Sequence, residues 1–207
     1  MSDNETGETH RRTYHHGDLR TVLLDAVRVQ LEAHGPDGVS LAQAAREVGV
    51  SSGAPYRHFK DKSAVLEAIV ADGMDRLKEG MREGRDAFAK GSLEAVAGTG
   101  QAYIDFARHE PSVFRLVFSL TEGHQASDAL KAKGAACFSV VMEAVALYLK
   151  RPVEEPIISR RAYMLWAFVH GHSFLMIDKK QIAQEYSAIE WDLLMDAARG
   201  FLDLTPT

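Results

Sequence analysis

Apolar residues recur at helical spacing along almost the whole chain, and no segment shows the apolar–polar alternation typical of a strand. The first stripe runs from Leu19 to Val27. Its helix ends at Gly35-Pro36, because glycine suits the C-terminal position and proline cannot continue the hydrogen-bond ladder. The other predicted helices lie at 40–48, from Ser51 or Ser52 onwards, within 63–91, and at 92–109, 111–118, 127–150, 157–180 and 188–204. The pattern therefore predicts an all-α fold.

The stretch from Ser40 to Lys62 carries the most specific pattern in the chain. Ser40, with Gln43 three residues later, is a capping box that starts one short helix, and Gly49 ends that helix. Pro55 is tolerated only in the first turn of a helix, because its missing N–H would have no partner there. A second helix therefore begins just before it, and the pair has the layout of a helix-turn-helix, whose second helix lies in the major groove of duplex DNA.

Side chains around Pro55 have the chemistry that DNA contact requires. Small residues permit close approach to base edges and to the thymine methyl group, and they are Ser51, Ser52, Gly53 and Ala54. A phenol and cations suited to phosphate follow, and they are Tyr56, Arg57, His58, Lys60 and Lys62. Phe59 is expected to anchor the second helix in the core. The alternative, a helical hairpin with a surface charge cluster, would not need these two sets together.

Residues 17–66 resemble the N-terminal DNA-binding domain of the tetracycline-repressor (TetR) family of bacterial transcriptional regulators. The resemblance rests on the order and spacing of Ser40, Gly49-Val50-Ser51, Gly53-Ala54, Tyr56-Arg57-His58-Phe59 and Lys62. It implies phosphate contact for Ser40, Tyr56, His58 and Lys62. It implies base-edge readout for Ser51, Ser52, Gly53, Ala54 and Arg57. Ser52 departs from the pattern, because many members place a lysine or another large polar residue there.

Breaks in the apolar pattern divide the chain into four parts. They are a flexible arm at 1–16, the helix-turn-helix domain at 17–62, a connecting helix and linker at 63–91, and a helical effector-binding and dimerisation domain at 92–207. Arg11 and Arg12 in the arm either reach a minor groove or phosphate, or belong to a disordered solubilising tail. Gly80 and Gly84 thin the apolar stripe of the connecting helix, which places the boundary of the body close behind them.

The helix at 157–180 is apolar on more than one face, so one subunit alone cannot cover it. The helix at 188–204 is also richer in apolar residues than one buried stripe needs. A symmetric dimer, in which both helices of each chain form a four-helix bundle, covers these faces. The segment from Trp166 to Gly171 resembles the signature of the WHG type of TetR C-terminal domain. The predicted interface residues are Phe168, Gly171, Leu175, Trp191, Leu194 and Phe201.

Aromatic and methionine side chains of the body admit two interpretations. They are either plain core or the walls of a mostly apolar effector pocket between helices, with His170 or Tyr103 as the polar anchor. Trp166 and His170 lie four residues apart and share one helix face. A place for His170 in the dimer interface stays open as well. The candidate ligand-binding residues are Tyr103, Phe106, Phe114, Phe118, Met142, Trp166, His170 and Phe174.

Charge and cysteine content narrow the partners and the compartment. The net charge is −5, yet residues 10–62 carry eight Lys/Arg against six Asp/Glu. A modestly basic module on an acidic body suits specific DNA contact. The single cysteine, Cys137, excludes an intramolecular disulfide and favours the reducing cytoplasm. The acidic N-terminus is unlike a signal peptide, and no apolar run approaches membrane-spanning length, with 157–177 the nearest.

Chemistry other than DNA binding has little support in the sequence. His170 and His172 point to different faces of one helix, so they cannot chelate a metal together. The chain has no zinc-type Cys/His spacing, nucleophile elbow or phosphate-binding glycine loop, so we expect no metal, cofactor or enzymatic activity. Together with the resemblance, the sequence predicts a homodimeric repressor that binds a palindromic double-stranded DNA operator and is released by a small, mostly apolar effector. The alternatives are an all-α enzyme and a ligand-independent DNA-binding or interaction protein.

Overall fold

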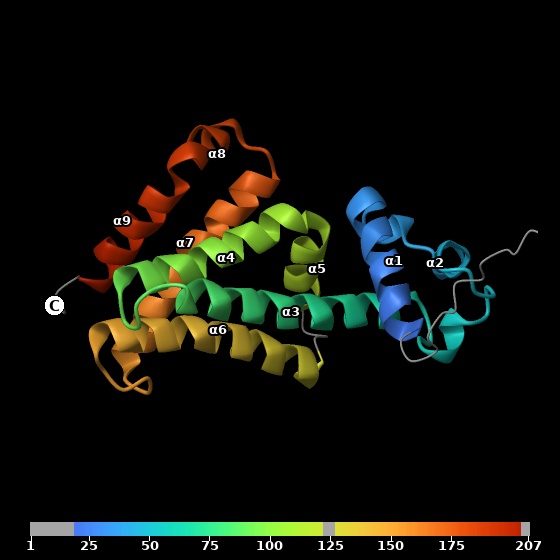
Figure 1. The fold of residues 1–207 in the computed structure, drawn as a ribbon, viewed down its shortest axis with the longest axis horizontal. Coiled ribbons are helices and arrows are strands. Elements are labelled where there is room, and N and C mark those ends of the chain that lie inside the picture. The colour runs from blue at the N-terminus through green and yellow to red at the C-terminus, as the bar shows by residue number, and fades with distance from the viewer. Residues whose placement is uncertain (1–18, 122–126, 204–207) are drawn as a thin grey trace, which may run out of the picture.

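A computed structural model describes residues 19–121 and 127–203, and over these residues the chain forms α-helices and 3-10 helices without a strand. The predicted all-α fold is confirmed. The arm predicted at 1–16 lies outside the described residues. A small head, which contains the first two helices, is joined to a larger helical body by one long helix (Figure 1).

The head consists of four short elements, which are α1 (Leu19–His34), η1 (Pro36–Gly38), α2 (Leu41–Glu47) and η2 (Pro55–Arg57). Gly35 and Gly49 follow α1 and α2 with φ angles of 70° and 76°. Glycine adopts this left-handed region without strain, so the two helices end close to the predicted positions. Leu23, Val27 and Leu31 of α1 are completely buried in the core of the head.

The second helix of the predicted helix-turn-helix begins at the expected place but is much shorter than expected. The N–H of Ala54 donates to the carbonyl of Ser51 (2.9 Å), which marks the start of a helical turn. Pro55 then supplies no donor, and the N–H of Phe59 closes the turn on the Pro55 carbonyl (2.9 Å). Asp61 caps the next helix two residues later, so the recognition element is the single 3-10 turn η2 with its flanking turns.

The long helix α3 (Lys62–Asp86) runs from the head into the body (Figure 1). Its 25 residues span roughly 37 Å at 1.5 Å per residue. The glycines that thin its apolar stripe do not interrupt it. A Cβ built on Gly84 would lie 2.4 Å from the carbonyl oxygen of Gly98, so this glycine allows close approach of the next helix. The boundaries at 62 and 91 between the predicted domains stay predictions.

The body contains the remaining elements, which are α4 (Leu93–His109), α5 (Pro111–Thr121), α6 (Asp128–Leu149), α7 (Pro156–Ile177), α8 (Gln181–Glu185), η3 (Ser187–Ile189) and α9 (Glu190–Leu202). α3 packs against α4, α5 and α6, and α7 packs against α4 and α6. α9 covers α4 and α7 at the end of the molecule far from the head (Figure 1). The helix predicted at 157–180 ends at Ile177 instead, and Lys179 has a φ of 53° before the short α8.

α6 is long and apolar enough to cross a membrane by length and composition, with a mean hydropathy of 1.5. This differs from the expectation that no such run exists and that 157–177 comes nearest. One helix of this kind is weak support for a membrane span, because the core helices of soluble proteins have the same length and composition. In the folded chain α6 packs on α3, α4 and α7.

Candidate nucleic-acid interface and ligand cavity

A buried glutamine holds the two helices of the head together. Gln30 on α1 is 3% exposed, and its side-chain oxygen accepts from the N–H of Ser40 (2.9 Å). Its amide nitrogen donates to Glu47 at the end of α2 (3.0 Å). Ser40 accepts from the N–H of Gln43 (3.3 Å) as predicted, but the Gln43 side chain turns to Glu47 rather than back to Ser40. The reciprocal half of the predicted capping box is therefore supplied by α1.

The turn around η2 separates buried from exposed side chains. Pro55 and Phe59, four residues apart, are buried and face the core of the head. The guanidinium of Arg20 lies 5.3 Å from the centre of the Phe59 ring, which ties α1 to this turn. The exposed side is formed by Ser51, Ser52, Gly53, Tyr56, Arg57, His58 and Lys60, and Ala54 is half-buried beside them. Seven of the nine residues predicted to contact DNA, all except Ser40 and Lys62, thus lie on one side of the turn around η2.

Ser40 and Lys62 lie differently from the other predicted DNA contacts. Ser40 is half-buried, with its hydroxyl acting as the cap of α2. The ammonium of Lys62 donates to the backbone carbonyl of Asp37 (3.0 Å), so it braces the turn between α1 and α2. Phosphate contact by these two residues stays a prediction.

A cavity of about 410 Å³ lies inside the body, with walls from α3, α4, α5, α6 and α7. This volume falls in the range of roughly 300–1,000 Å³ typical of small-molecule sites, and its walls are mostly apolar and aromatic, as in such sites. The lining residues are Met74, Leu77, Met81, Tyr103, Val117, Phe118, Leu130, Lys131, Gly134, Ala135, Cys137, Phe138, Val141, Tyr163 and Trp166.

Three of the eight predicted ligand-binding residues, Tyr103, Phe118 and Trp166, line this cavity. The other five lie outside its walls. Phe114 is completely buried, and its ring packs between those of Phe118 and Phe174 at 4.8 and 5.3 Å, so it belongs to the core. The remaining residues outside the lining are Phe106, Met142, His170 and Phe174.

Sequence reasoning missed the contribution of α3 to the cavity wall, and on α6 it selected Met142 rather than the residues that line the cavity. α3 contributes Met74, Leu77 and Met81, which the sequence interprets only as the apolar stripe of a connecting helix. α6 contributes a wall that includes Gly134 and Phe138. The methionines of this stripe could have indicated a ligand cavity, because flexible methionine side chains adapt to bound molecules.

His170 sits behind the cavity wall among aromatic rings. Its Nδ1 atom shares a hydrogen bond of 2.8 Å with the hydroxyl of Tyr103, which lines the cavity. Its ring centre lies 4.5 Å from that of Phe118, 5.2 Å from that of Trp166 and 4.9 Å from that of Phe174. Tyr103, Phe118 and Trp166, the three predicted residues that line the cavity, therefore all contact His170. His170 supports the cavity wall from behind and does not line it.

Cys137 contributes a protonated thiol to the cavity wall. Its Sγ donates to the backbone carbonyl of Met74 (3.4 Å). Burial raises the pKa of this thiol to about 11, so thiolate chemistry at neutral pH is disfavoured.

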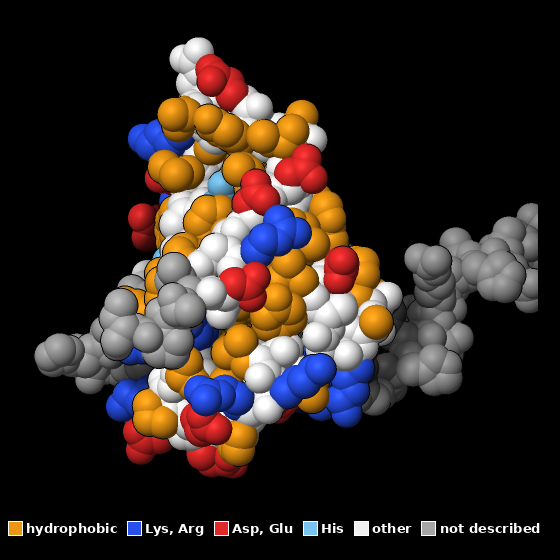
Figure 2. All heavy atoms as spheres, turned by 90° about the vertical axis from the view of Figure 1, so that its left-hand side faces the viewer, with side chains coloured by type: hydrophobic (Ala, Val, Ile, Leu, Met, Phe, Trp, Pro, Cys, Tyr) orange, Lys and Arg blue, Asp and Glu red, His pale blue; other side chains and the backbone are white. Residues whose placement is uncertain are grey.

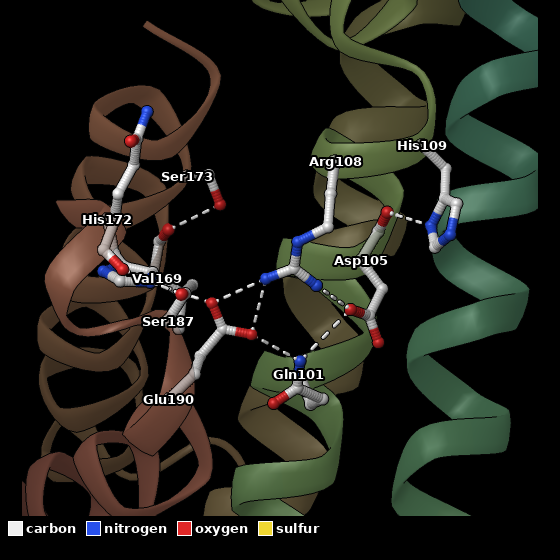
Figure 3. A network of polar contacts seen from close by, with 10 residues as sticks. Gln101, Asp105, Arg108, His109, Val169, His172, Ser173, Ser187 and Glu190 are labelled. Carbon is white, nitrogen blue, oxygen red and sulfur yellow. Dashed lines mark hydrogen bonds and ion pairs between the residues drawn. The ribbon is translucent and has the colours of Figure 1, made fainter. Parts of the chain in front are cut away.

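A second polar cluster fixes α9 to the body (Figure 3). The carboxylate of Glu190 accepts from Arg108 at 2.7 Å, from Gln101 at 2.7 Å and from His172 at 3.1 Å. Asp105 accepts from Gln101 on the other side. Burial would raise the pKa of Glu190, but the hydrogen bonds from His172, Arg108 and Gln101 outweigh it and hold that pKa at about 2. Within the described residues, no group of three or more His, Cys, Asp or Glu side chains could hold a metal ion.

The predicted dimer interface contains both exposed and buried residues. Gly171 and Leu175 are exposed on α7, and Leu175 is 44% accessible. Phe168, Trp191 and Phe201 are half-buried. Leu194 is 4% exposed, because it packs beside Gly100 of α4, so its assignment is corrected to the core of the subunit.

Apolar side chains gather on the end of the molecule that carries α7, α8 and α9 (Figure 2). The large exposed hydrophobic residues of α7 and of the segment from α8 to η3 are Tyr163, Leu175, Ile182, Tyr186 and Ile189. Tyr163 is 59% exposed and also lines the cavity, so the exposed face of α7 adjoins the cavity wall. An apolar face of this kind on a soluble protein is typical of an interaction surface.

Two family models match this chain. Residues 23–69 match the model of bacterial regulatory proteins of the tetR family. Residues 96–198 match the model of the tetracyclin repressor-like C-terminal domain, which includes the Trp166–Gly171 segment. The two matches cover the head with the start of α3, and most of the body.

Solved structures agree with the family models. A protein with unknown function from Rhodococcus sp. RHA1 is 28% identical, with a TM-score of 0.78 over 92% of this chain and 97% of its own. A TetR family transcription regulator from Marinobacter aquaeolei VT8 is 16% identical, with a TM-score of 0.64 over 88% and 94%. The transcriptional regulator FadR from Bacillus subtilis, in complex with stearoyl-CoA, is 16% identical, with a TM-score of 0.58 over 86% and 98%. The last two likenesses concern the fold alone.

Proposed function

The chain belongs to the tetracycline-repressor family of transcriptional regulators, and on that premise we propose that it is a cytoplasmic homodimeric repressor. It binds a palindromic DNA operator through the exposed surface around η2. A small, mostly apolar effector in the 410 Å³ cavity releases it. The observation that carries the proposal is the connection between this exposed surface and the cavity. One long helix, α3, begins shortly after η2 and also lines the cavity.

The surface around η2 combines two kinds of DNA contact. Ser51, Ser52 and Gly53 are small and exposed, so the backbone can approach base edges closely, and Arg57 offers a donor pair for guanine. Tyr56, 56% exposed, lies at the rim, where its hydroxyl suits phosphate. Each subunit presents one such surface. Two of them reach successive major grooves about 34–36 Å apart only if the chain dimerises.

The dimer forms through the exposed face of α7 together with α9. Gly171 leaves open space on this face, which permits close approach of a symmetry-related helix. Leu175→Glu and Gly171→Arg should convert a dimer into a monomer in analytical ultracentrifugation. Val29→Glu, which changes an apolar residue on α1 that is even more exposed (67% against 44% for Leu175), is the control and should leave the mass unchanged. A dimer mass for all three variants would contradict this interface.

The effector is mostly apolar because the cavity offers little polar surface. Burying a charge without a partner costs several kcal/mol. The thiol of Cys137 in the wall already donates to a carbonyl, and the ammonium of Lys131, the charged side chain in the lining, is 57% exposed and donates to Asp128 at 3.3 Å. The Tyr103–His170 pair supplies a polar anchor at the wall. FadR, the similar protein solved with stearoyl-CoA, has a ligand that carries a long apolar acyl chain, and we propose that the effector here likewise presents an apolar part to this cavity.

The DNA assignment is tested by selecting duplexes from a random library with the purified protein and measuring affinity for a selected and a scrambled sequence. Arg57→Ala should weaken the selected duplex by about 1–3 kcal/mol and relax its sequence preference. Tyr56→Ala should weaken both duplexes alike and leave the salt dependence unchanged, because the phenol hydroxyl is uncharged and releases no counterion. Arg82→Ala, on an exposed arginine of the body, is the control. Equal effects of Arg57→Ala on both duplexes would refute base readout by this surface.

A further inference from the structure

The first turn of α5 is capped by a carboxylate from the head. Glu32, near the end of α1, accepts hydrogen bonds from the backbone N–H groups of Ser112 (3.0 Å) and Val113 (2.9 Å). These groups belong to the first turn of α5, where a helix leaves its N–H groups without partners of its own. An anionic acceptor there is also favoured by the helix dipole. The cap comes from about 80 residues away in the sequence.

Glu110, which stands in the N-cap position of α5, does not cap this helix with its side chain. The carbonyl of Glu110 accepts from the N–H of Phe114 (2.8 Å), which makes Glu110 the residue before α5. Its carboxylate is turned towards Arg76 of α3, whose Nη2 donates to it at 3.0 Å. Arg28 of α1 lies 4.0 Å from the same carboxylate. The start of α5 therefore depends on Glu32 for its cap, and it shares ion pairs with both α1 and α3.

The same helix forms part of the cavity wall one turn further on. Val117 and Phe118 line the cavity, and Val117 lies four residues, or about 6 Å, beyond Val113. Between them α5 packs tightly on α3, because a Cβ built on Gly73 would lie 2.9 Å from Val113. A molecule that pushes Phe118 outward therefore cannot leave the first turn of α5 in place without straining this contact.

We propose that Glu32 is the positioning residue that couples occupancy of the cavity to the orientation of the DNA-binding head. With the cavity empty, Glu32 holds the first turn of α5 and keeps α1 in the orientation that fits DNA. A ligand that displaces α5 withdraws the two N–H groups from Glu32, and the head loses this support. The inference rests on the proposed function for its biological meaning, but the mechanical link between cavity and head can be measured without DNA.

The experiment uses full-length protein and Nile red, an uncharged aromatic dye, as the cavity probe. In wild type, dye binding should speed hydrogen exchange at the C-terminal end of α1 and in the first turn of α5. In Glu32→Ala the first turn of α5 should exchange at least about tenfold faster without dye, and the dye should no longer change exchange in α1. Glu67→Ala, an exposed glutamate on α3, is the matched control and should behave as wild type.

With a selected duplex, dye should raise the DNA dissociation constant at least about fivefold in wild type and in Glu67→Ala, but less than about twofold in Glu32→Ala. Glu32→Gln, which keeps an acceptor oxygen without the charge, should restore part of the effect. If Nile red does not bind, Gly134→Leu places a side chain in the cavity and serves as the probe, alone and combined with Glu32→Ala.

The proposal would be overturned if the dye changed hydrogen exchange in α1, or the DNA dissociation constant, as much in Glu32→Ala as in wild type. A cavity probe that leaves exchange in α1 of the wild type unchanged would also overturn it. If no duplex binds, the proposed DNA function fails, while the exchange measurements still decide the role of Glu32.

Discussion

Replacing Glu190 with glutamine should loosen the junction of α4, α7 and α9. The Glu190 side chain is 7% exposed and accepts hydrogen bonds from Arg108, Gln101 and His172 (Figure 3). Glutamine has nearly the same shape, but it keeps one acceptor oxygen and turns an amide N–H₂ towards these donors. The change therefore removes the charge and part of the hydrogen bonding with little change in packing.

The expected loss follows from the burial of the two partners. Removing one member of a fully buried ion pair costs about 3–5 kcal/mol, because the other charge is left without compensation. The Arg108 side chain is 39% exposed, so water can solvate part of its guanidinium. We therefore expect a loss of about 2 kcal/mol in the free energy of unfolding at pH 7.

Acid should remove much of the difference between wild type and Glu190→Gln. The pKa of Glu190 is lowered from 4.5 to about 2 on folding, so its stabilisation is fully present above pH 4.5 and is lost as the pH falls towards 2. At pH 3.5 the unfolded chain already binds most of a proton at this position and the folded chain does not. About 1.4 kcal/mol of the stabilisation should then be gone.

The assay is urea unfolding followed by circular dichroism at pH 7 and pH 3.5, at one protein concentration, since the proposed dimer would make stability depend on concentration. Asp192→Asn removes the same charge from an exposed position in the same turn of α9 and is the control. The reasoning would be refuted if both variants lost equal stability at pH 7, or if the difference between wild type and Glu190→Gln persisted unchanged at pH 3.5.

Three further variants have expected outcomes. Gly84→Ala should lower the melting temperature, because its Cβ would lie 2.4 Å from the Gly98 carbonyl, whereas Gly80→Ala, with open space around it, should stabilise α3 by about 0.5–1 kcal/mol. Gln30→Leu should cost about 1–3 kcal/mol in unfolding free energy by leaving the Ser40 N–H without its acceptor. The same variant should also weaken DNA binding, which fluorescence anisotropy measures, and unchanged affinity would contradict the role of Gln30 in the head.

The helix starts were predictable because caps are local. Ser40, Ser92 and Ser127 each accept from a backbone N–H three residues later, and each stands where the sequence pattern begins a helix. Such hydrogen bonds depend on neighbouring residues alone. The sequence did not predict how short η2 is: the next helix already begins at the Asp61 cap, which leaves a single turn after Pro55.

The cavity was only partly predictable because helical stripes look alike whether they face a core or a cavity. Trp166 and Phe118 line it as expected, whereas Phe114 from the same aromatic set is sealed in the core. Whether an aromatic residue faces the cavity or the core depends on the distance between neighbouring helices. That distance cannot be inferred from the sequence of one helix. Met74 and Met81 show the converse. The sequence assigns them to the apolar stripe of a connecting helix, and in the structure they line the cavity.

The sequence by itself determined the helical class, the positions of most helix ends and the separation of Pro55 and Phe59 from the exposed residues beside them. These features follow from caps, proline chemistry and periodicity over a few residues. The tertiary structure alone decided which partners Glu32 and Glu190 meet. Both would suit a solvated helix face. Glu32 acquires its role from donors about 80 residues away, and Glu190 from Gln101 and Arg108, 89 and 82 residues away, together with His172. Long-range electrostatic contacts depend on the packing of whole helices, and that packing arises only when the chain folds.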